Sequence, residues 1–192
     1  MSNLIPGVTW TDSNGNDRLI DIASRAYKDR IIYLQGEITE ELAAEIELLL
    51  LTLESENKEK PIKMIIQSPG GSIQAGYTII DAMKKVKCPV YTQATGLVAS
   101  MATTVFINGE KGNRLIRPHC RLLVHQPLGG VKGQASEIEI EYKEIQFLKE
   151  QLENEYVALT NVPKEKMHEM MDRDTWLSAK EAVKLGLADK IN

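Results

Sequence analysis

A serine, a histidine and an aspartate occur in this order in segments whose local patterns suit catalysis. Ser100 lies between a strand-like and an apolar helix-like segment, His125 ends an apolar run, and Asp174 comes shortly before a helix start. A hydroxyl becomes a nucleophile when a histidine takes its proton, and a carboxylate can orient that histidine. The three residue types therefore suit acyl transfer. Spacing alone leaves Asp172 as a rival carboxylate.

Each of these residues also has an ordinary structural interpretation. Ser100 could cap the helix that follows it, although the same position would place a nucleophile at the positive end of that helix. His125 could be a structural histidine at a strand end. The other histidines, His119 and His168, lie in polar surroundings, and we expect both on the surface.

The loop Ser-Pro-Gly-Gly-Ser at residues 68–72 is a second candidate feature. Two adjacent glycines after a strand can simply form a tight turn. They can also let the main chain approach a substrate and point an N–H group at it. Acyl transfer needs such donors because negative charge builds on the carbonyl oxygen in the transition state. The N–H groups of Gly71 and Met101 would make a two-donor oxyanion hole.

Strand-like and helix-like segments alternate along the chain, which favours an α/β fold with a mostly parallel sheet. We expect residues 1–17 to form a flexible N-terminal arm and residues 18–192 to form a single domain. Gly96 is expected to turn the chain after the third strand. Strands are expected at residues 30–38, 61–67, 89–95 and 122–126, and helices at 20–27, 39–53, 72–86, from about 100, 134–159 and 178–186.

Composition excludes several functional classes. The chain has 192 residues, 43% of them hydrophobic, which suits one domain with a real core. The net charge is −4 with no basic stripe, so nucleic acid is a poor partner. No apolar run reaches membrane-spanning length and no secretory signal is visible, so we expect a cytoplasmic protein. Cys88 and Cys120 form no C-x-x-C pair, so we expect reduced thiols and no metal site.

Taken together, these segments resemble the proteolytic subunit of the Clp protease over nearly the whole chain. Each segment is weak alone, but their order and spacing fit the family. The segments that carry the resemblance are 27–32, 68–72 (Ser-Pro-Gly-Gly-Ser), 99–101 (Ala-Ser-Met), 125–130 (His-Gln-Pro-Leu-Gly-Gly), 133–136 and 173–179.

The resemblance implies a role for each matching position. It makes Ser100 the nucleophile, His125 the general base and Asp174 the orienting carboxylate of a serine endopeptidase that cleaves unfolded polypeptides. It makes Gly71 and Met101 the oxyanion donors. It also implies substrate contacts at four further positions, namely Gly70, Gln126, Pro127 and Leu128.

The resemblance further implies a fold and an assembly. The fold would be that of the crotonase superfamily, built from ββα units, with a projecting handle helix at residues 134–159. Two heptameric rings would stack face to face around a closed chamber, fed by a hexameric Clp ATPase, with no metal or organic cofactor. Two alternatives remain open: a weakly active or regulatory paralogue in mixed rings, and a crotonase-type acyl-CoA enzyme.

The sequence departs from the family pattern at two single positions and at the surface where the ATPase would dock. At the single positions, Gln67 and Ala102 replace the usual asparagine and glycine, which is typical of a divergent paralogue. In the family, an apolar, aromatic-rich pocket between subunits receives a hydrophobic ATPase loop. Here most of its wall is polar, so we expect weak docking, or a second paralogue that supplies the apolar pocket. The matching wall residues are Lys63, Ile65, Gln93, Thr95, Leu115 and Arg117.

Overall fold

The structure is a computed structural model that describes residues 7–11 and 14–192. Its elements, in chain order, are β1 (Gly7–Thr11), β2 (Asp17–Asp21), α1 (Ile22–Lys28), β3 (Ile31–Gln35), α2 (Glu40–Glu56), β4 (Ile62–Ser68), α3 (Ile73–Lys85), β5 (Val90–Ala99), α4 (Met101–Ile107), β6 (Arg114–Ile116), β7 (Arg121–Val124), α5 (Ala135–Leu159), α6 (Lys164–Asp172), β8 (Thr175–Ser178), α7 (Ala179–Lys184) and β9 (Lys190–Ile191).

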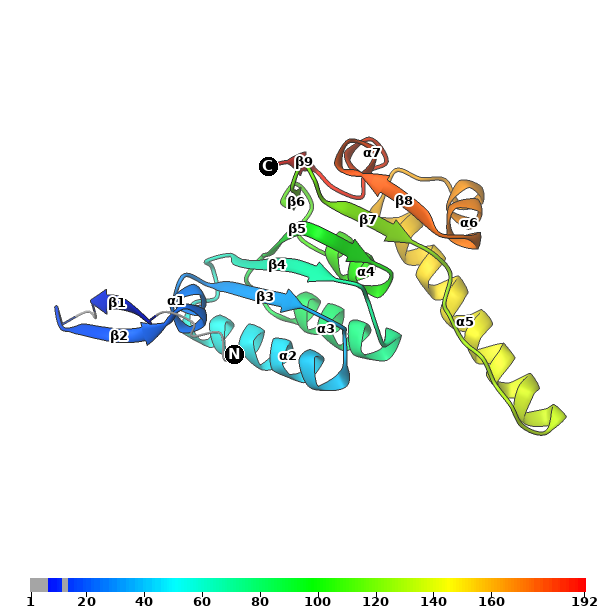
Figure 1. The fold of residues 1–192 in the computed structure, drawn as a ribbon, viewed down its shortest axis with the longest axis horizontal. Helices are drawn as coiled ribbons and strands as arrows, with labels where there is room; N and C mark the ends of the chain where they lie inside the picture. The colour runs from blue at the N-terminus through cyan, green and yellow to red at the C-terminus, as the bar shows by residue number, and fades with distance from the viewer. Residues whose placement is uncertain (1–6, 12–13) are drawn as a thin grey trace, which may run out of the picture.

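A mostly parallel sheet organises the described part of the chain. Its strands run in the order β3-β4-β5-β6-β9, and β7 pairs with the far end of β5. These neighbours are all parallel, whereas β8 is antiparallel to β7. Helices α2, α3 and α4 lie side by side against the sheet (Figure 1). The predicted α/β class is therefore confirmed.

Local sequence signals explain where the helices of this layer begin. Thr39 accepts a hydrogen bond from the N–H of Leu42 and so caps α2. Ser72 caps α3 in the same way through the N–H of Ala75. Each cap fixes how its helix leaves the preceding strand. The apolar stripes of both helices then face the sheet.

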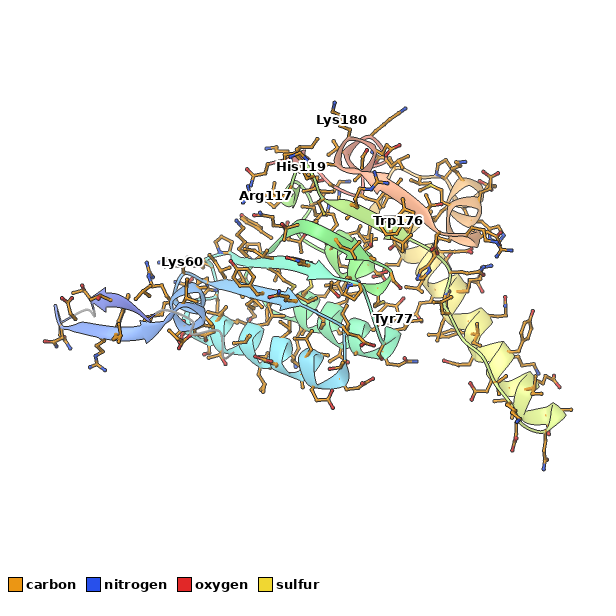
Figure 2. The ribbon with its side chains drawn as sticks, viewed as in Figure 1. Lys60, Tyr77, Arg117, His119, Trp176 and Lys180 are labelled. Atoms are coloured by element: carbon orange, nitrogen blue, oxygen red, sulfur yellow. The ribbon has the colours of Figure 1, made fainter. Side chains whose placement is uncertain are left out.

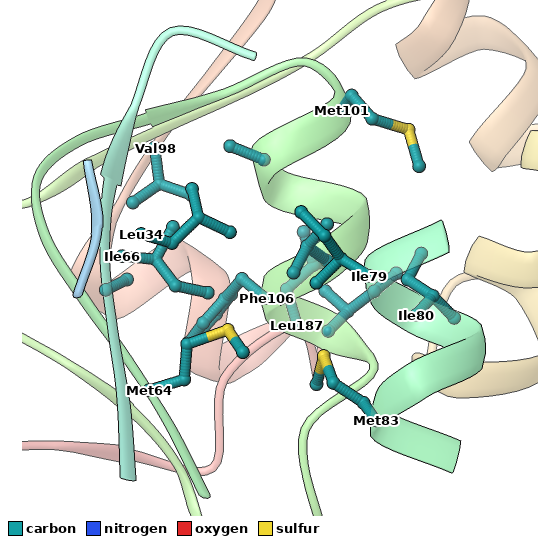
Figure 3. Packing of buried hydrophobic residues seen from close by; sticks show 14 of the residues in the cluster. Leu34, Met64, Ile66, Ile79, Ile80, Met83, Val98, Met101, Phe106 and Leu187 are labelled. Atoms are coloured by element: carbon teal, nitrogen blue, oxygen red, sulfur yellow. The ribbon is translucent and has the colours of Figure 1, made fainter. Parts of the chain in front are cut away.

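The core lies between the sheet and this helix layer. Leu34, Met64, Ile66 and Val98 of the strands meet Ile79, Ile80 and Met83 of α3 and Phe106 of α4 (Figure 3). All eight side chains are buried, and burial of each aliphatic or aromatic side chain contributes roughly 1.5–3 kcal/mol. The core thereby fixes the strand ends that carry the site.

Helix α5 runs away from the globular body and projects into solvent at its N-terminal end (Figure 1). Residues 135–144 are all exposed, whereas Leu152 and Tyr156 are buried against the core. The predicted projecting helix at 134–159 is thus confirmed, with Gln134 as its N-cap. At the start of α7, Ser178 and Glu181 form a capping box.

Two parts of the chain differ from expectation. The predicted turn at Gly96 is wrong: β5 continues to Ala99, because the positive φ of Gly96 lets the strand bend without ending. In the N-terminal region, β1 and β2 form an antiparallel hairpin, so the predicted boundary after residue 17 falls inside β2. The remaining residues of the expected arm, 1–6 and 12–13, lie outside the described residues, and the flexibility of the arm stays a prediction.

Cys88 and Cys120 are both free and buried. Within residues 7–11 and 14–192, no helix is both long and apolar enough to cross a membrane.

Candidate active site

Strand register brings three distant side chains to one edge of the sheet. The parallel pairing of β5 with β7 places Ala99 beside Leu123, just before Ser100 and His125. The antiparallel pairing of β7 with β8 places Val124 opposite Thr175, so that the next residues along, His125 and Asp174, also meet. The three side chains therefore converge because three neighbouring strand ends converge.

These side chains form a continuous hydrogen-bonded series. His125 Nε2 lies 2.8 Å from Ser100 Oγ, and His125 Nδ1 lies 3.2 Å from Asp174 Oδ1. The histidine side chain is only 14% exposed, whereas that of Asp174 is 62% exposed. The rival Asp172 does not reach the histidine in this arrangement, and His119 and His168 are exposed, as expected.

Ser100 occupies the N-cap position of α4 but does not cap it. Its side chain makes no capping hydrogen bond and is directed to His125 instead. Its backbone has φ 55° and ψ −130°, a sparsely populated conformation for a residue other than glycine. Hydrogen bonds from Ser100 N to Leu123 O and from Thr103 Oγ1 to Val98 O and Leu123 O secure this turn. The surroundings thus hold the hydroxyl in a strained, outward-facing position.

The glycine loop at 68–72 packs directly against Ser100. A Cβ atom on Gly70 would lie 2.7 Å from Ser100 Cβ and 3.1 Å from Met101 N, so only glycine fits there. Ile38 ties the loop down: its N–H donates to Gly70 O at 2.8 Å, and its carbonyl accepts from Ser72 N at 2.9 Å.

This arrangement leaves two main-chain donors free beside the serine. Among the described residues, the N–H groups of Gly71 and Met101 donate no hydrogen bond within the chain. Both residues line the same pocket as Ser100 and His125. Two free N–H groups beside a nucleophile are what an oxyanion hole requires.

A mainly apolar pocket of about 250 Å³ opens beside the serine. Two buried hydroxyl groups lie in its lining: Thr104 Oγ1 donates to Tyr156 Oη at 3.3 Å. Burial raises the pKa of Tyr156, so this phenol stays neutral. The pocket is lined by Pro69, Gly71, Ile73, Ser100, Met101, Thr104, Leu123, His125, Gln126, Pro127, Leu128, Leu152, Tyr156 and Met171.

The four residues expected to contact substrate have different surroundings. Gln126, Pro127 and Leu128 line the pocket, and Leu128 is largely exposed. Gly70 is buried, and both of its main-chain groups are already used: its N–H donates to Ser68 Oγ and its carbonyl accepts from Ile38 N. The N–H of Gly70 is not free for a substrate, whereas its carbonyl could accept a second hydrogen bond, and the role of Gly70 stays a prediction.

Sequence reasoning missed three residues that shape this site. Ile38, Thr104 and Tyr156 come from three different elements or loops and carry no local motif. Their positions follow only from the packing of α4 against α5 and from the bridge between Ile38 and Gly71. In the described ranges, no group of three or more His, Cys, Asp or Glu side chains could hold a metal ion.

Comparison with known families agrees with this geometry. A family model described as Clp protease matches residues 13–192, almost the whole chain. The chain belongs to the Clp protease family. Membership implies peptidase activity, and it fits the mixed α/β fold with a mainly parallel sheet. Proteins of this family generally self-assemble and work with ATPases.

Proposed function

We propose that this chain is a serine endopeptidase subunit of a chambered Clp-type protease, acting on unfolded polypeptides through an acyl-enzyme. The observation that carries the proposal is the series Ser100–His125–Asp174 beside two free N–H groups. A structural histidine or a capping serine would need neither the series nor the donors. A crotonase-type enzyme would need the donors only.

The geometry supports a specific order of proton transfers. His125 Nε2 takes the Ser100 hydroxyl proton while Oγ bonds to the scissile carbonyl carbon. The resulting oxyanion accepts hydrogen bonds from Gly71 and Met101. The imidazolium, stabilised by Asp174, then gives its proton to the leaving amine as the C–N bond breaks. Water then loses a proton to His125 and attacks the acyl carbon, and the imidazolium gives that proton to Oγ as the bond between the acyl carbon and Oγ breaks.

The decisive test is a fluorogenic peptide assay with and without a serine-directed phosphonate. Ser100→Ala should abolish hydrolysis and labelling because no acyl-enzyme can form. Mass spectrometry should place the adduct on Ser100. Ser55→Ala on the exposed face of α2 is the matched control and should behave as wild type. An adduct on another residue, or undiminished activity of Ser100→Ala, would refute the proposal.

The exposed half of α5 supports a contact between rings. Ile138, Ile140, Tyr142 and Phe147 are all more than 40% exposed on a helix that projects from the body. So much apolar surface is unusual for a helix surrounded by water. We infer that α5 pairs with its counterpart in a second ring, which would close the chamber around the active sites.

Docking of the ATPase is expected to be weak in rings of this chain alone. Ile65, Gln93 and Leu115 are register neighbours across β4, β5 and β6, so the expected wall residues do lie together. Gln93 is already buried in the chain, with Oε1 unpartnered among the described residues, so it offers the loop no apolar contact. Arg117 is exposed beside β6 (Figure 2), and burying its charge under an apolar loop would cost free energy.

The expected loss of ATPase affinity follows from the loss of one apolar anchor in the pocket. Such an anchor contributes roughly 1.5–3 kcal/mol, which is about 10- to 100-fold in affinity for each loop. Several loops bind together, so the losses multiply. A pull-down with the host ATPases should show weak binding by homomeric rings and stronger binding after Lys63→Tyr with Gln93→Ile. Tight ATP-dependent binding and processive degradation by this chain alone would contradict the expectation.

A further inference from the structure

Asp174 is the most exposed member of the hydrogen-bonded series. Its carboxylate is 62% exposed and, within the described part of the chain, hydrogen bonds with His125 alone. Water competes for a carboxylate in this position. The main chain that carries Asp174 must therefore hold it against His125 Nδ1.

Two sets of contacts fix that main chain, one on each side of Asp174. On the C-terminal side, Thr175 pairs with Val124 in the β7–β8 ladder. On the N-terminal side, the N–H of Gln126 donates to Met171 O at 2.6 Å. Asp172 O accepts from Gln126 Nε2 at 2.8 Å and from Arg173 Nη1, the next residue along, at 3.1 Å. Of these two bonds to Asp172 O, only the one from Gln126 joins the segment to another part of the fold. Gln126 directly follows His125. The residues at the end of β7 therefore carry the candidate base and also hydrogen bond to the segment that precedes Asp174.

We propose that Gln126 is a positioning residue for Asp174. Its side-chain amide fixes the end of α6 and the residues after it, so that Asp174 Oδ1 stays within reach of His125 Nδ1. The inference rests on the proposed serine peptidase function. It differs from the role that the family resemblance implies for this position, which is contact with substrate.

The two roles make different demands on the amide group. In the structure Nε2 already donates one of its two N–H groups to a main-chain carbonyl, so the second N–H and Oε1 remain for a substrate. A substrate contact would act on KM and would do so whether or not Asp174 is present. A positioning residue acts on kcat, and only while there is a carboxylate to position.

The test is a double-mutant cycle measured with a fluorogenic peptide. Gln126→Met keeps the length and the main-chain bond but removes the donor, and it should lower kcat about 10- to 100-fold, since a displacement near 1 Å can cost about 100-fold. Gln126→Glu places an acceptor against Asp172 O and should lower kcat further. In the Asp174→Asn background, Gln126→Met should change kcat by less than about 3-fold, since interacting residues are not additive.

Two controls keep the outcomes distinct. Gln151→Met, at an exposed position on α5, should match wild type, and sedimentation with thermal melting should show that each variant assembles. An undiminished effect of Gln126→Met in the Asp174→Asn background, or an effect confined to KM, would overturn the inference. Failure of the proposed function shows itself elsewhere, as phosphonate labelling that does not fall on Ser100.

Discussion

The glycine loop offers the sharpest test of the oxyanion hole. In Gly71→Ala the new Cβ would lie 2.7 Å from Ile38 N and closer still to Ile38 O. The residue also has φ +153°, a region that L-residues rarely adopt. The substitution keeps the N–H group that we assign to the oxyanion hole. At the oxyanion hole, Gly71→Ala therefore changes the position and direction of the N–H group without removing it.

The expected loss can be worked out from this geometry. Ordinary contacts begin near 3.5 Å, so the loop must move by about 1 Å away from Ile38. A displacement of that size moves the Gly71 N–H off the position of the oxyanion. Loss of one oxyanion donor costs about 10²–10³ in kcat, or roughly 2.7–4 kcal/mol. We expect Gly71→Ala to lose kcat by this factor and to react with the phosphonate more slowly.

Gly36→Ala is the matched control for backbone strain. Gly36 also has a positive φ, at +87°, but a Cβ there would meet nothing within 4 Å. Alanine should cost about 1–2 kcal/mol of stability at such a position without touching the site. Gly36→Ala should therefore melt lower than wild type yet keep its kcat. A Gly71→Ala variant that assembles and keeps wild-type kcat would show that this N–H is not an oxyanion donor.

Three further predictions concern the candidate carboxylate, helix α5 and the ion pair between Asp189 and Arg114. Asp174→Asn should assemble and lose about 10³–10⁴ in kcat, whereas Asp172→Asn should stay within a few-fold, and the reverse order would assign the carboxylate to Asp172. Deleting residues 134–150 should leave single rings by sedimentation, and intact double rings would contradict the role of α5. Burial alone would raise the pKa of Asp189, but hydrogen bonds from Arg114 and Gly112 and the charge of Arg114 outweigh it and hold that pKa below its ordinary value. Asp189→Asn should therefore cost about 3–5 kcal/mol in urea unfolding at pH 7, and the difference from wild type should shrink as the pH falls below about 4; a constant difference would refute the coupling.

Local signals were sufficient for the helix caps and for the fold class, but not for the choice of candidate catalytic side chains. The caps at Thr39 and Ser178 depend on contacts within three residues, so they could be predicted from the sequence. The fold class followed from the alternation of strands and helices. The choice of Ser100 and His125 over other residues of their types depended on the resemblance, because each has an equally good structural interpretation when taken alone.

The features of the fold that could not be predicted from the sequence depend on contacts between residues far apart in the chain. The extension of β5 past Gly96 depends on β7, which pairs with residues 97–99 and not with the beginning of that strand. Strand β8 is short and ends in a helix cap, so it has no distinct apolar pattern. The clamp by Gln126 joins residues that are 46 apart in sequence. No window of local sequence contains both partners of such a contact.

The choice between the two candidate aspartates shows where the sequence stops being informative. Asp172 and Asp174 are two residues apart, so in an extended segment both would face the same side, and strand periodicity cannot separate them. What separates them is the pairing of Val124 with Thr175, which sets the adjacent Asp174 opposite His125, while Asp172 falls at the end of α6. That register holds only if the chain before Asp174 is fixed as well, and there the observed contacts from another part of the fold come from Gln126. In the mechanism that we propose, Asp174 is thus favoured over Asp172 by strand pairing and by a neighbour of the histidine, and not by any property of the aspartate itself.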